Sequence, residues 1–324
     1  MYALISGGTG VTGAALLRFL LNRGDRVVAL IRPNSPRSTW LPKHTNLQIV
    51  SIALGEYAKE SHKIPDHPDV FVHLAWDGSR GKEKVGNRNN IALQSANIQS
   101  CIDAAELCHK IKCPVFVCTG SQAEYGNLDF PAREDMCCKP TNGYGAAKLC
   151  AGQMTRILCS QYGIRHIWAR LFSVYGPHDG TESLIDTSIA SLLEGVSPAY
   201  TMGEQIWDYI YSYDAAYALS LLAEQGEDGE IYNVASGDPH PLSFFIQQMH
   251  TVVDPKIAPK IGAKSYSPNQ IMHLEADITK LKRRTNFFCR FSFAQGIYEI
   301  LQQYISNKKV ASWSCVQRST LVNL

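Results

Sequence analysis

Ser6-Gly7-Gly8-Thr9-Gly10-Val11-Thr12-Gly13 is the stretch that decides the fold of this chain. It follows an apolar run, Tyr2–Ser6, that predicts a β-strand, and it opens a helical pattern over Gly13–Arg23. Because glycine has no Cβ atom, such a loop turns tightly and lets a pyrophosphate approach the backbone. The free N–H groups and the positive dipole end of the helix attract the same anion. The loop therefore predicts a dinucleotide site inside a βαβ unit.

The rest of the first half repeats this alternation of strands and helices. Further strands are expected at Arg26–Ile31, Leu47–Ile52, Val70–Ala75, Pro114–Thr119 and Arg165–Leu171, and helices at Asn87–Cys108 and Gly145–Tyr162. Val70-Phe71-Val72 and Val115–Cys118 are apolar throughout, as strands buried on both faces must be. The pattern predicts an α/β fold built on a doubly wound parallel sheet.

After Leu171 the pattern changes to short mixed elements separated by Pro and Gly. We expect a dinucleotide-binding domain at 1–172, with segments near 206–236 (Ile231–Ala235 most clearly) returning to the sheet. A smaller C-terminal substrate lobe is expected at 173–205 and 237–305, and a loosely ordered tail at 306–324.

The composition excludes several classes of protein. Apolar residues make up 45% of the chain and charged residues 19%, and the net charge is +2. This balance favours a globular protein and gives no reason to expect a nucleic-acid partner. No apolar run approaches the roughly 18 residues of a membrane span. The first residues, Met1–Ile5, do not resemble a secretion signal, so we expect a cytoplasmic protein with no membrane partner.

Ten cysteines raise the question of a metal site. The nearest approach to a ligand set is Cys108, His109, Cys113 and Cys118, but Cys108 falls on a predicted helix and Cys118 on a predicted strand. We therefore expect no metal, and reduced cysteines that pack as small apolar side chains.

The end of the second predicted strand bears on the choice of cofactor. Enzymes that prefer NAD commonly place an acid about 20 residues past the glycine loop, where it holds the ribose hydroxyls. This chain has Arg32 there, with Arg37 nearby. Because a guanidinium pairs with a 2′-phosphate, we expect NADP(H) in preference to NAD(H). Alternatively, Arg32 is a solvated residue that stacks on the adenine, and NAD(H) stays open.

Tyr144 and Lys148 form the pattern Y-x-x-x-K at the start of a predicted helix. A spacing of four places both side chains on one helix face. A phenol is ordinarily protonated near neutral pH, and an ammonium one turn away stabilises the phenolate, which favours proton transfer. The pattern predicts an acid–base pair.

Taken in order, these motifs resemble the extended short-chain dehydrogenase/reductases, that is, the NAD-dependent epimerase/dehydratase family. The resemblance runs from residue 2 to about residue 300. The motifs that carry it are the glycine loop, His73-Leu74-Ala75-Trp76, Gly120-Ser121 with Tyr125-Gly126, Tyr144 with Lys148, and Arg170–Pro177.

The resemblance implies a Rossmann fold and a set of functional residues. The catalytic residues would be Ser121, Tyr144 and Lys148. Those expected to bind the cofactor are Gly7, Thr9, Gly10, Val11, Thr12, Gly13, Arg32, Leu74, Ala75, Trp76, Thr119, Tyr144, Lys148, Leu171 and Ser173. Those expected to bind substrate are Ser121, Gln122, Tyr144, Ser173, His178, Gln205 and Trp207. His73, which closes a buried strand, is expected to order the cofactor loop.

Members of this family mostly act on nucleotide sugars, and the residues after Ser121 narrow the choice of reaction. Related dehydratases carry an Asp-Glu pair there, whereas this chain has Gln122-Ala123. Epimerase-reductases carry a cysteine where Ala123 stands. The remaining chemistry is hydride transfer with one proton relay. A 4-ketoreductase is expected, because Arg32 favours NADP. A 4-epimerase that retains NAD and a non-catalytic, dinucleotide-sensing regulator are the alternatives.

The sugar-nucleotide contacts depart from the family pattern. Members usually have Arg-Asp where this chain has Gln205-Ile206-Trp207-Asp208, a second diphosphate arginine where it has Tyr266–Gln270, and an Asn where it has Ser173. Arg80, Arg88, Lys264 or Arg283 would have to replace the two missing diphosphate contacts. A non-nucleotide carbonyl substrate therefore stays open beside a nucleotide sugar. By analogy with the family, the helices at 87–108 and 145–162 would form a homodimer.

Overall fold

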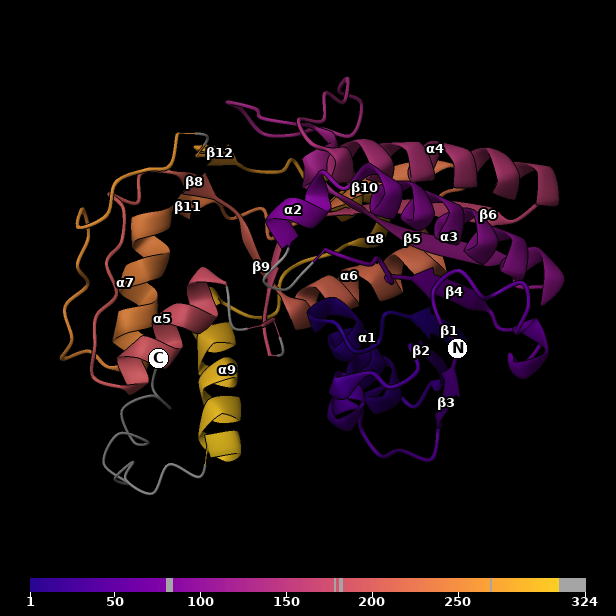
Figure 1. Cartoon of the computed structure of the whole chain (residues 1–324), viewed down its shortest axis with the longest axis horizontal. Coiled ribbons are helices and arrows are strands. Elements are labelled where there is room, and N and C mark those ends of the chain that lie inside the picture. Colours follow the sequence, from indigo (N-terminus) through magenta and orange to yellow (C-terminus); the bar gives the residue numbers. More distant parts are fainter. Residues whose placement is uncertain (80–83, 178, 181–182, 269, 309–324) are drawn as a thin grey trace.

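The computed structural model describes residues 1–79, 84–177, 179–180, 183–268 and 270–308. Its centre is a parallel seven-stranded sheet in the order β10-β6-β5-β4-β1-β2-β3 (Figure 1). The strands are β1 Tyr2–Ser6, β2 Arg26–Ile31, β3 Leu47–Ser51, β4 Val70–His73, β5 Val115–Ser121, β6 Arg165–Leu171 and β10 Glu230–Val234. The strand order reverses between β1 and β4, so the predicted doubly wound fold is confirmed.

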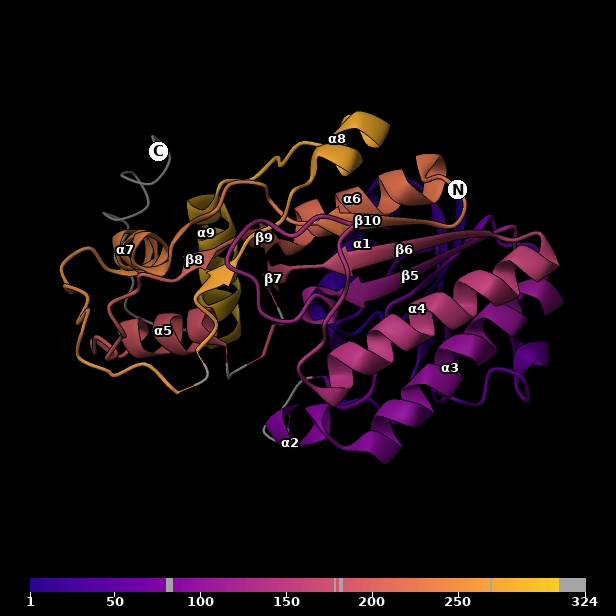
Figure 2. The same cartoon turned by 90° about the horizontal axis from the view of Figure 1, so that it is seen from above.

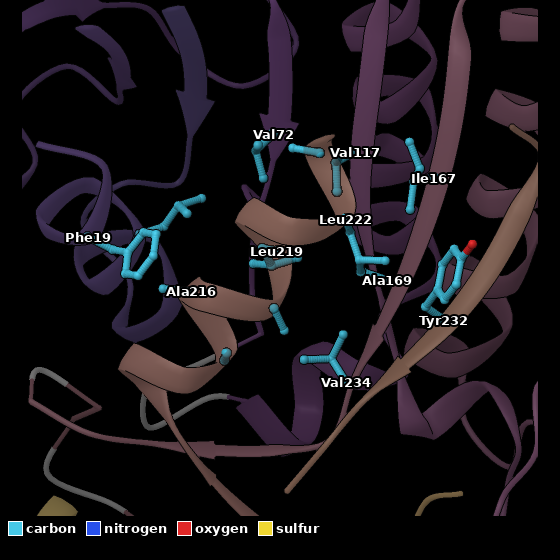
Figure 3. Close-up of a cluster of buried hydrophobic side chains, with 14 of the residues drawn as sticks. Phe19, Val72, Val117, Ile167, Ala169, Ala216, Leu219, Leu222, Tyr232 and Val234 are labelled. Atoms are coloured by element: carbon cyan, nitrogen blue, oxygen red, sulfur yellow. The ribbon is translucent and has the colours of Figure 1, made fainter. Parts of the chain in front are cut away.

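Helices cover both faces of this sheet (Figure 2). Helices α3 (Ile91–Lys110) and α4 (Gly143–Tyr162) lie on one face, and α1 (Val11–Asn22) and α6 (Ser212–Gln225) lie on the other. Alternate side chains of a strand enter the two cores. Val117 of β5 packs with Leu219 and Leu222 of α6 (Figure 3), whereas its neighbour Phe116 packs in the core under α3 and α4. This burial on both faces explains why the strands are apolar throughout.

A second group of elements stands beyond the carboxyl edge of the sheet, and Figure 1 shows it on the left. It contains α5 (Leu184–Leu193), α7 (Leu242–Val253) and α9 (Phe293–Lys308), which share a third apolar core. A small sheet, β11-β8-β12, joins His240–Pro241, Ile206–Trp207 and His273–Leu274. The remaining elements are β7 (Ser173–Tyr175) paired with β9 (Tyr209–Tyr211), α2 (Lys84–Arg88), α8 (Thr279–Thr285) and 3₁₀ turns at Pro36–Trp40, Ser61–Lys63 and Gln122–Glu124. The strand expected at Ile231–Ala235 joins the main sheet as β10 beside β6. The domain boundaries themselves stay a prediction.

Two predicted elements are different in the structure, each for a local reason. The single helix expected over Asn87–Cys108 is two helices, α2 and α3. Asn90 caps α3, because its side chain accepts a hydrogen bond from the Leu93 N–H at 3.1 Å. Strand β4 ends at His73 rather than Ala75, since the Ser6 hydroxyl accepts hydrogen bonds from the backbone N–H groups of Leu74 and Ala75.

The last helix ends later in the chain than expected. Helix α9 continues to Lys308, so residues 306–308, expected in the tail, are helical, and the rest of that tail lies outside the described residues. Over the described part of the chain, no helix combines the length and the apolar character needed to cross a membrane.

Candidate active site

The glycine loop leaves no room for a side chain at Gly7, which lies against the end of β4, or at Gly13, which lies against Gly7. Gly7 has a φ of +73°, and a Cβ atom on it would lie 2.8 Å from the Ala75 nitrogen. A Cβ atom on Gly13 would lie 2.2 Å from the Gly7 carbonyl oxygen. No side chain caps the N-terminus of α1, and its first turn holds no acidic residue. The loop therefore has the open backbone and the free helix N-terminus that suit a pyrophosphate.

A cavity of about 710 Å³ opens over this loop and extends to the start of α4. It brings together every predicted cofactor residue except Ser173: Gly7, Thr9, Gly10, Val11, Thr12, Gly13, Arg32, Leu74, Ala75, Trp76, Thr119, Tyr144, Lys148 and Leu171. A cavity of this size suits a cofactor-sized ligand. The chemistry of its lining fits a nicotinamide dinucleotide, because bare loop backbone and the side chains of Tyr144 and Lys148, the predicted acid–base pair, line the same space.

Sequence reasoning missed part of the lining. The missed residues are Leu30, Ile31, Ser35, Pro36, Ile52, Ala53, Leu54, Tyr57, Asp77, Gly78 and Ser79. Several of them follow the predicted strands directly, and the carboxyl ends of neighbouring parallel strands share one edge of the sheet. That rule, applied to the residues after β3, could have found Ile52–Leu54.

The end of the cavity near β2 is basic. Arg32, Ser35 and Arg37 line it, and the Arg37 guanidinium lies 5.1 Å from the centre of the Trp40 ring. Among the described lining residues, the one carboxylate belongs to Asp77, which follows β4 rather than β2. The arrangement places two guanidinium-bearing residues where an acid would favour NAD.

At the other end, Lys148 and Tyr144 lie on the first turns of α4. Asn142 caps the helix, and its side chain accepts a hydrogen bond from the Gly145 N–H at 2.9 Å. The Lys148 side chain is buried, and its ammonium donates a hydrogen bond to the Thr119 carbonyl oxygen at 2.7 Å. The same ammonium lies 3.8 Å from the centre of the Trp76 ring. The Tyr144 and Trp76 rings meet edge to face at 5.8 Å.

Ser121 ends β5 beneath this helix start. Its hydroxyl accepts a hydrogen bond from the Ala123 N–H at 3.2 Å, and its own N–H donates to Glu124 Oε1 at 2.8 Å. A Cβ atom on Gly145 would lie 2.3 Å from the Ala123 carbonyl oxygen, so the turn after Ser121 packs directly on the start of α4. Ser121 and Gln122 nevertheless lie outside the lining of the cofactor cavity.

A buried ion pair fixes the turn after Ser121. Arg170 Nε donates to Glu124 Oε2 at 2.7 Å, and both side chains are almost inaccessible to solvent. The Trp168 indole N–H also donates to this carboxylate, at 3.0 and 3.1 Å. Burial lowers the pKa of Arg170, but the Glu124 carboxylate outweighs this effect, so the pKa rises above its ordinary value and the guanidinium stays charged.

His73 lies under the cofactor loop, as expected. Its Nδ1 forms a hydrogen bond with the Ser6 hydroxyl at 2.8 Å, and that hydroxyl also holds the Leu74 and Ala75 amides. The cysteine set weighed from sequence is spread over a helix, a loop and a strand. Among the described residues, the metal-ligating atoms that do gather are those of His73, Cys101 and Cys118, all buried and within 4.8 Å of one another.

The remaining predicted substrate residues lie elsewhere. Ser173 begins β7, beside Tyr209 of β9. Gln205 and Trp207 lie at β8, in the middle of the small sheet, and His178 and Arg80 lie outside the described residues. Arg88 approaches the site, because its guanidinium lies 5.4 Å from the centre of the Tyr144 ring. Lys264 is exposed, and Arg283 lines a separate cavity of about 590 Å³.

Comparison with known families gives a match over most of the chain. Residues 3–235 match the NAD dependent epimerase/dehydratase family. The chain is 26% identical over 347 residues to a dTDP-glucose 4,6-dehydratase of Shigella flexneri, and the match covers 95% of this chain and 93% of that protein.

Solved structures give the same picture. A UDP-N-acetylglucosamine 4-epimerase from Methanobrevibacter ruminantium, in complex with UDP-N-acetylmuramic acid, superposes with a TM-score of 0.84 at 25% identity, covering 94% of this chain and 98% of that one. A dTDP-glucose 4,6-dehydratase from Bacillus anthracis, in complex with NAD, superposes with a TM-score of 0.79 at 21% identity, covering 95% and 98%. The predicted Rossmann-type architecture agrees with both.

The buried ion pair leads to a prediction about stability. Replacing Glu124→Ala leaves the Arg170 guanidinium buried without its carboxylate, which should lower the free energy of unfolding by about 3–5 kcal/mol. Urea denaturation followed by circular dichroism measures this. Asp135→Ala, which removes the partner of Arg133 in an exposed pair, is the control and should leave the unfolding midpoint near that of the wild type. Equal midpoints for the two variants would contradict the prediction.

Proposed function

The chain belongs to the NAD dependent epimerase/dehydratase family, and we propose that it is an NAD(P)-dependent oxidoreductase that transfers hydride to or from a sugar carbon, most specifically a nucleotide-sugar 4-ketoreductase. One observation carries the proposal: Tyr144 and Lys148 line the same cavity as the glycine loop Gly7–Gly13. The acid–base pair and the expected cofactor site therefore face a common space.

The chemistry needs one hydride and one proton. A nicotinamide dinucleotide held by the glycine loop Gly7–Gly13 would supply the hydride to the carbonyl carbon. The Tyr144 phenol donates its proton to the carbonyl oxygen, which becomes the alcohol, and the Lys148 ammonium stabilises the phenolate that results. Solvent then returns a proton to Tyr144. In the reverse direction, the phenolate accepts the proton of the alcohol.

The turn after Ser121 favours this simple chemistry over dehydration. Gln122 and Ala123 offer no acid or base, and the one carboxylate on the turn belongs to Glu124. That carboxylate is buried and already accepts hydrogen bonds from Ser121, Trp168 and Arg170. It is therefore committed to structure, and no group on this turn is free to move protons at a neighbouring sugar carbon.

Two alternatives follow from specific observations. A 4-epimerase that retains NAD uses the same groups, and the similarity in fold to the Methanobrevibacter 4-epimerase supports it. The two enzymes differ in whether the cofactor leaves after each turnover. A non-catalytic, dinucleotide-sensing regulator is less well supported, since such relatives typically lose the tyrosine or the lysine, and this chain has both.

We propose NADP(H) as the preferred cofactor, with NAD(H) as the alternative. The support is the basic end of the cavity, where Arg32 and Arg37 can pair with a 2′-phosphate. The solved dehydratase from Bacillus anthracis is in complex with NAD. The preference for NADP(H) is therefore proposed from the residues of this chain and not from that relative.

We propose a nucleotide sugar as the substrate, held partly by Gln205 and Trp207. The relatives named above act on or bind dTDP and UDP sugars. Gln205 Oε1 and Trp207 Nε1 are buried and have no hydrogen-bond partner among the described residues. Gln205 lies directly before β8 and Trp207 lies within it. A polar ligand would satisfy this acceptor and this donor, because burying either without a partner is costly.

We also propose that the protein is a cytoplasmic homodimer. Ile91 of α3 and Met154 and Ile157 of α4 are 67%, 48% and 50% exposed, an apolar surface that a second copy would cover. The cysteines of the described residues are all free thiols, which suits a reducing compartment.

The proposed reaction predicts turnover with loss of NADPH absorbance. NADPH oxidation should occur with at least one 4-keto-6-deoxy sugar nucleotide of a panel carrying UDP, dTDP, GDP and CDP. Tyr144→Phe, which keeps the ring but removes the proton donor, should lower kcat by about 10²-fold or more. If instead the purified protein carries tightly bound NAD and interconverts 4-epimers, the epimerase replaces the reductase. Binding of cofactor without turnover of any substrate favours the regulator.

The cofactor proposal predicts a selective effect of Arg32. Arg32→Ala should lower kcat/KM for NADPH by about tenfold, because one charge-assisted contact on an exposed side chain is lost. It should leave kcat/KM for NADH nearly unchanged. A several-fold preference of the wild type for NADH would overturn the proposal.

The substrate proposal predicts nucleotide binding by calorimetry. Among UDP, dTDP, GDP and CDP, at least one should bind, and Gln205→Leu should weaken that binding by about tenfold through loss of a buried acceptor. Ser265→Ala, on an exposed loop, serves as the control. If none of the four nucleotides binds, a non-nucleotide carbonyl substrate becomes the better interpretation.

The dimer proposal predicts a change of mass on substitution. Light scattering should give twice the mass of the chain for the wild type and the monomer mass for Ile157→Glu. Phe288→Glu, which alters an equally exposed apolar residue elsewhere, should stay dimeric. A monomeric wild type would refute the dimer.

A further inference from the structure

The ammonium of Lys148 is buried without a carboxylate partner. Its side chain is 4% exposed, and among the described residues no ion pair joins it to an acid. The Lys148 ammonium donates a hydrogen bond to the Thr119 carbonyl oxygen at 2.7 Å. One carbonyl is a modest substitute for the water that a buried ammonium loses. Another group must therefore stabilise this charge.

The ring of Trp76 also contacts this ammonium. Its ring centre lies 3.8 Å from the Lys148 nitrogen, well within the roughly 6 Å over which an aromatic face attracts a cation. The electron-rich face of an indole is the strongest of the natural cation–π partners. The same ring meets Tyr144 edge to face, so Trp76 contacts both members of the acid–base pair.

Hydrogen bonds that run through residues of α3 and α2 fix the orientation of the indole. Its Nε1 donates a hydrogen bond to Gln94 Oε1 at 3.0 Å, and Gln94 Nε2 donates to the Asn87 carbonyl oxygen at 2.8 Å. Gln94 is buried in α3, so this chain of contacts leads from a rigid helix to the ring. On its free side Trp76 lines the cofactor cavity. The hydrogen bond to Gln94 helps to orient the ring face toward Lys148.

We propose that Trp76 is a positioning residue for the acid–base pair, holding the Lys148 ammonium on its indole face and the Tyr144 ring at its edge. The effect of Trp76 on catalysis rests on the proposed function. The contacts of Trp76 with Lys148 and Tyr144 do not depend on which substrate is used. Trp76 thereby has a role beyond lining a cofactor site. The Arg88 guanidinium also approaches this cluster, 5.4 Å from the Tyr144 ring centre.

Amine labelling tests the contact directly. Acetylation by acetic anhydride, followed by peptide mass spectrometry, reports how well Lys148 is shielded. Trp76→Leu removes the aromatic face, and Lys148 should then be acetylated on the order of tenfold faster than in the wild type. Trp76→Phe keeps a face and should remain within about threefold of the wild type. Exposed Lys256 is the internal standard, and circular dichroism confirms that both variants are folded.

Measurement of kcat tests whether the contact of Trp76 with Lys148 affects catalysis. With a substrate identified from the panel above, kcat should fall on the order of tenfold in Trp76→Leu and recover largely in Trp76→Phe. KM for NADPH, measured in the same assay, shows whether cofactor binding changes as well.

Three results would overturn the inference: unchanged labelling of Lys148 in Trp76→Leu, equal labelling in both variants, or a Leu variant with wild-type kcat. If the wild type turns over no sugar substrate, the proposed function fails, while the labelling result still decides whether Trp76 holds Lys148.

Discussion

The contact between the glycine loop and the end of β4 is the constraint on which the site depends. A Cβ atom on Gly7 would lie 2.9 Å from the Leu74 carbonyl carbon, so the two backbones touch where the strand order reverses. The Ser6 hydroxyl closes the same junction by accepting hydrogen bonds from the Leu74 and Ala75 amides. Because β4 stops there, the chain turns outward and delivers Trp76 to the cavity. The position of the cavity, and of Trp76 at its edge, thus follows from one close approach of backbone.

The buried cations Arg170 and Lys148 lie near the carboxyl edge of the sheet, and they differ in the groups that stabilise their charge. Arg170 is neutralised by Glu124, which ties β6 to the turn after Ser121. Lys148 has a carbonyl and an aromatic face instead, neither of which carries a full negative charge. Its positive potential is therefore not cancelled locally and can act on Tyr144 and on a ligand in the cavity. The Arg170 charge therefore holds the turn after Ser121, whereas the Lys148 charge is available for the proposed chemistry.

The fold, and the gathering of the glycine loop, Tyr144 and Lys148 around one cavity, could be predicted because their signals are local. β1, β2 and β6 begin and end at the predicted residues, since each is a short apolar run between strong turn signals. The break before Ile91 was missed because the polar residues 87–90 were counted as the first turn of the helix, although the apolar period begins at Ile91 and Asn90 caps α3 there. The pairing of Glu124 with Arg170 joins residues far apart in the chain, so no spacing rule indicates it. The same holds for the contact of Trp76 with Lys148 and for the unpartnered polar atoms at Gln205 and Trp207.

The central claim is that this cavity binds a nicotinamide dinucleotide across the glycine loop. Calorimetric titration of NADPH into wild type, Gly13→Ala and Gly86→Ala tests it most directly. A Cβ atom on Gly13 would meet backbone at 2.2 Å, whereas one on Gly86 meets nothing within 4 Å. The account predicts that Gly13→Ala weakens binding by about tenfold to a hundredfold and that Gly86→Ala binds like the wild type. Equal binding by Gly13→Ala, or a wild type that binds neither NADPH nor NADH, would contradict it.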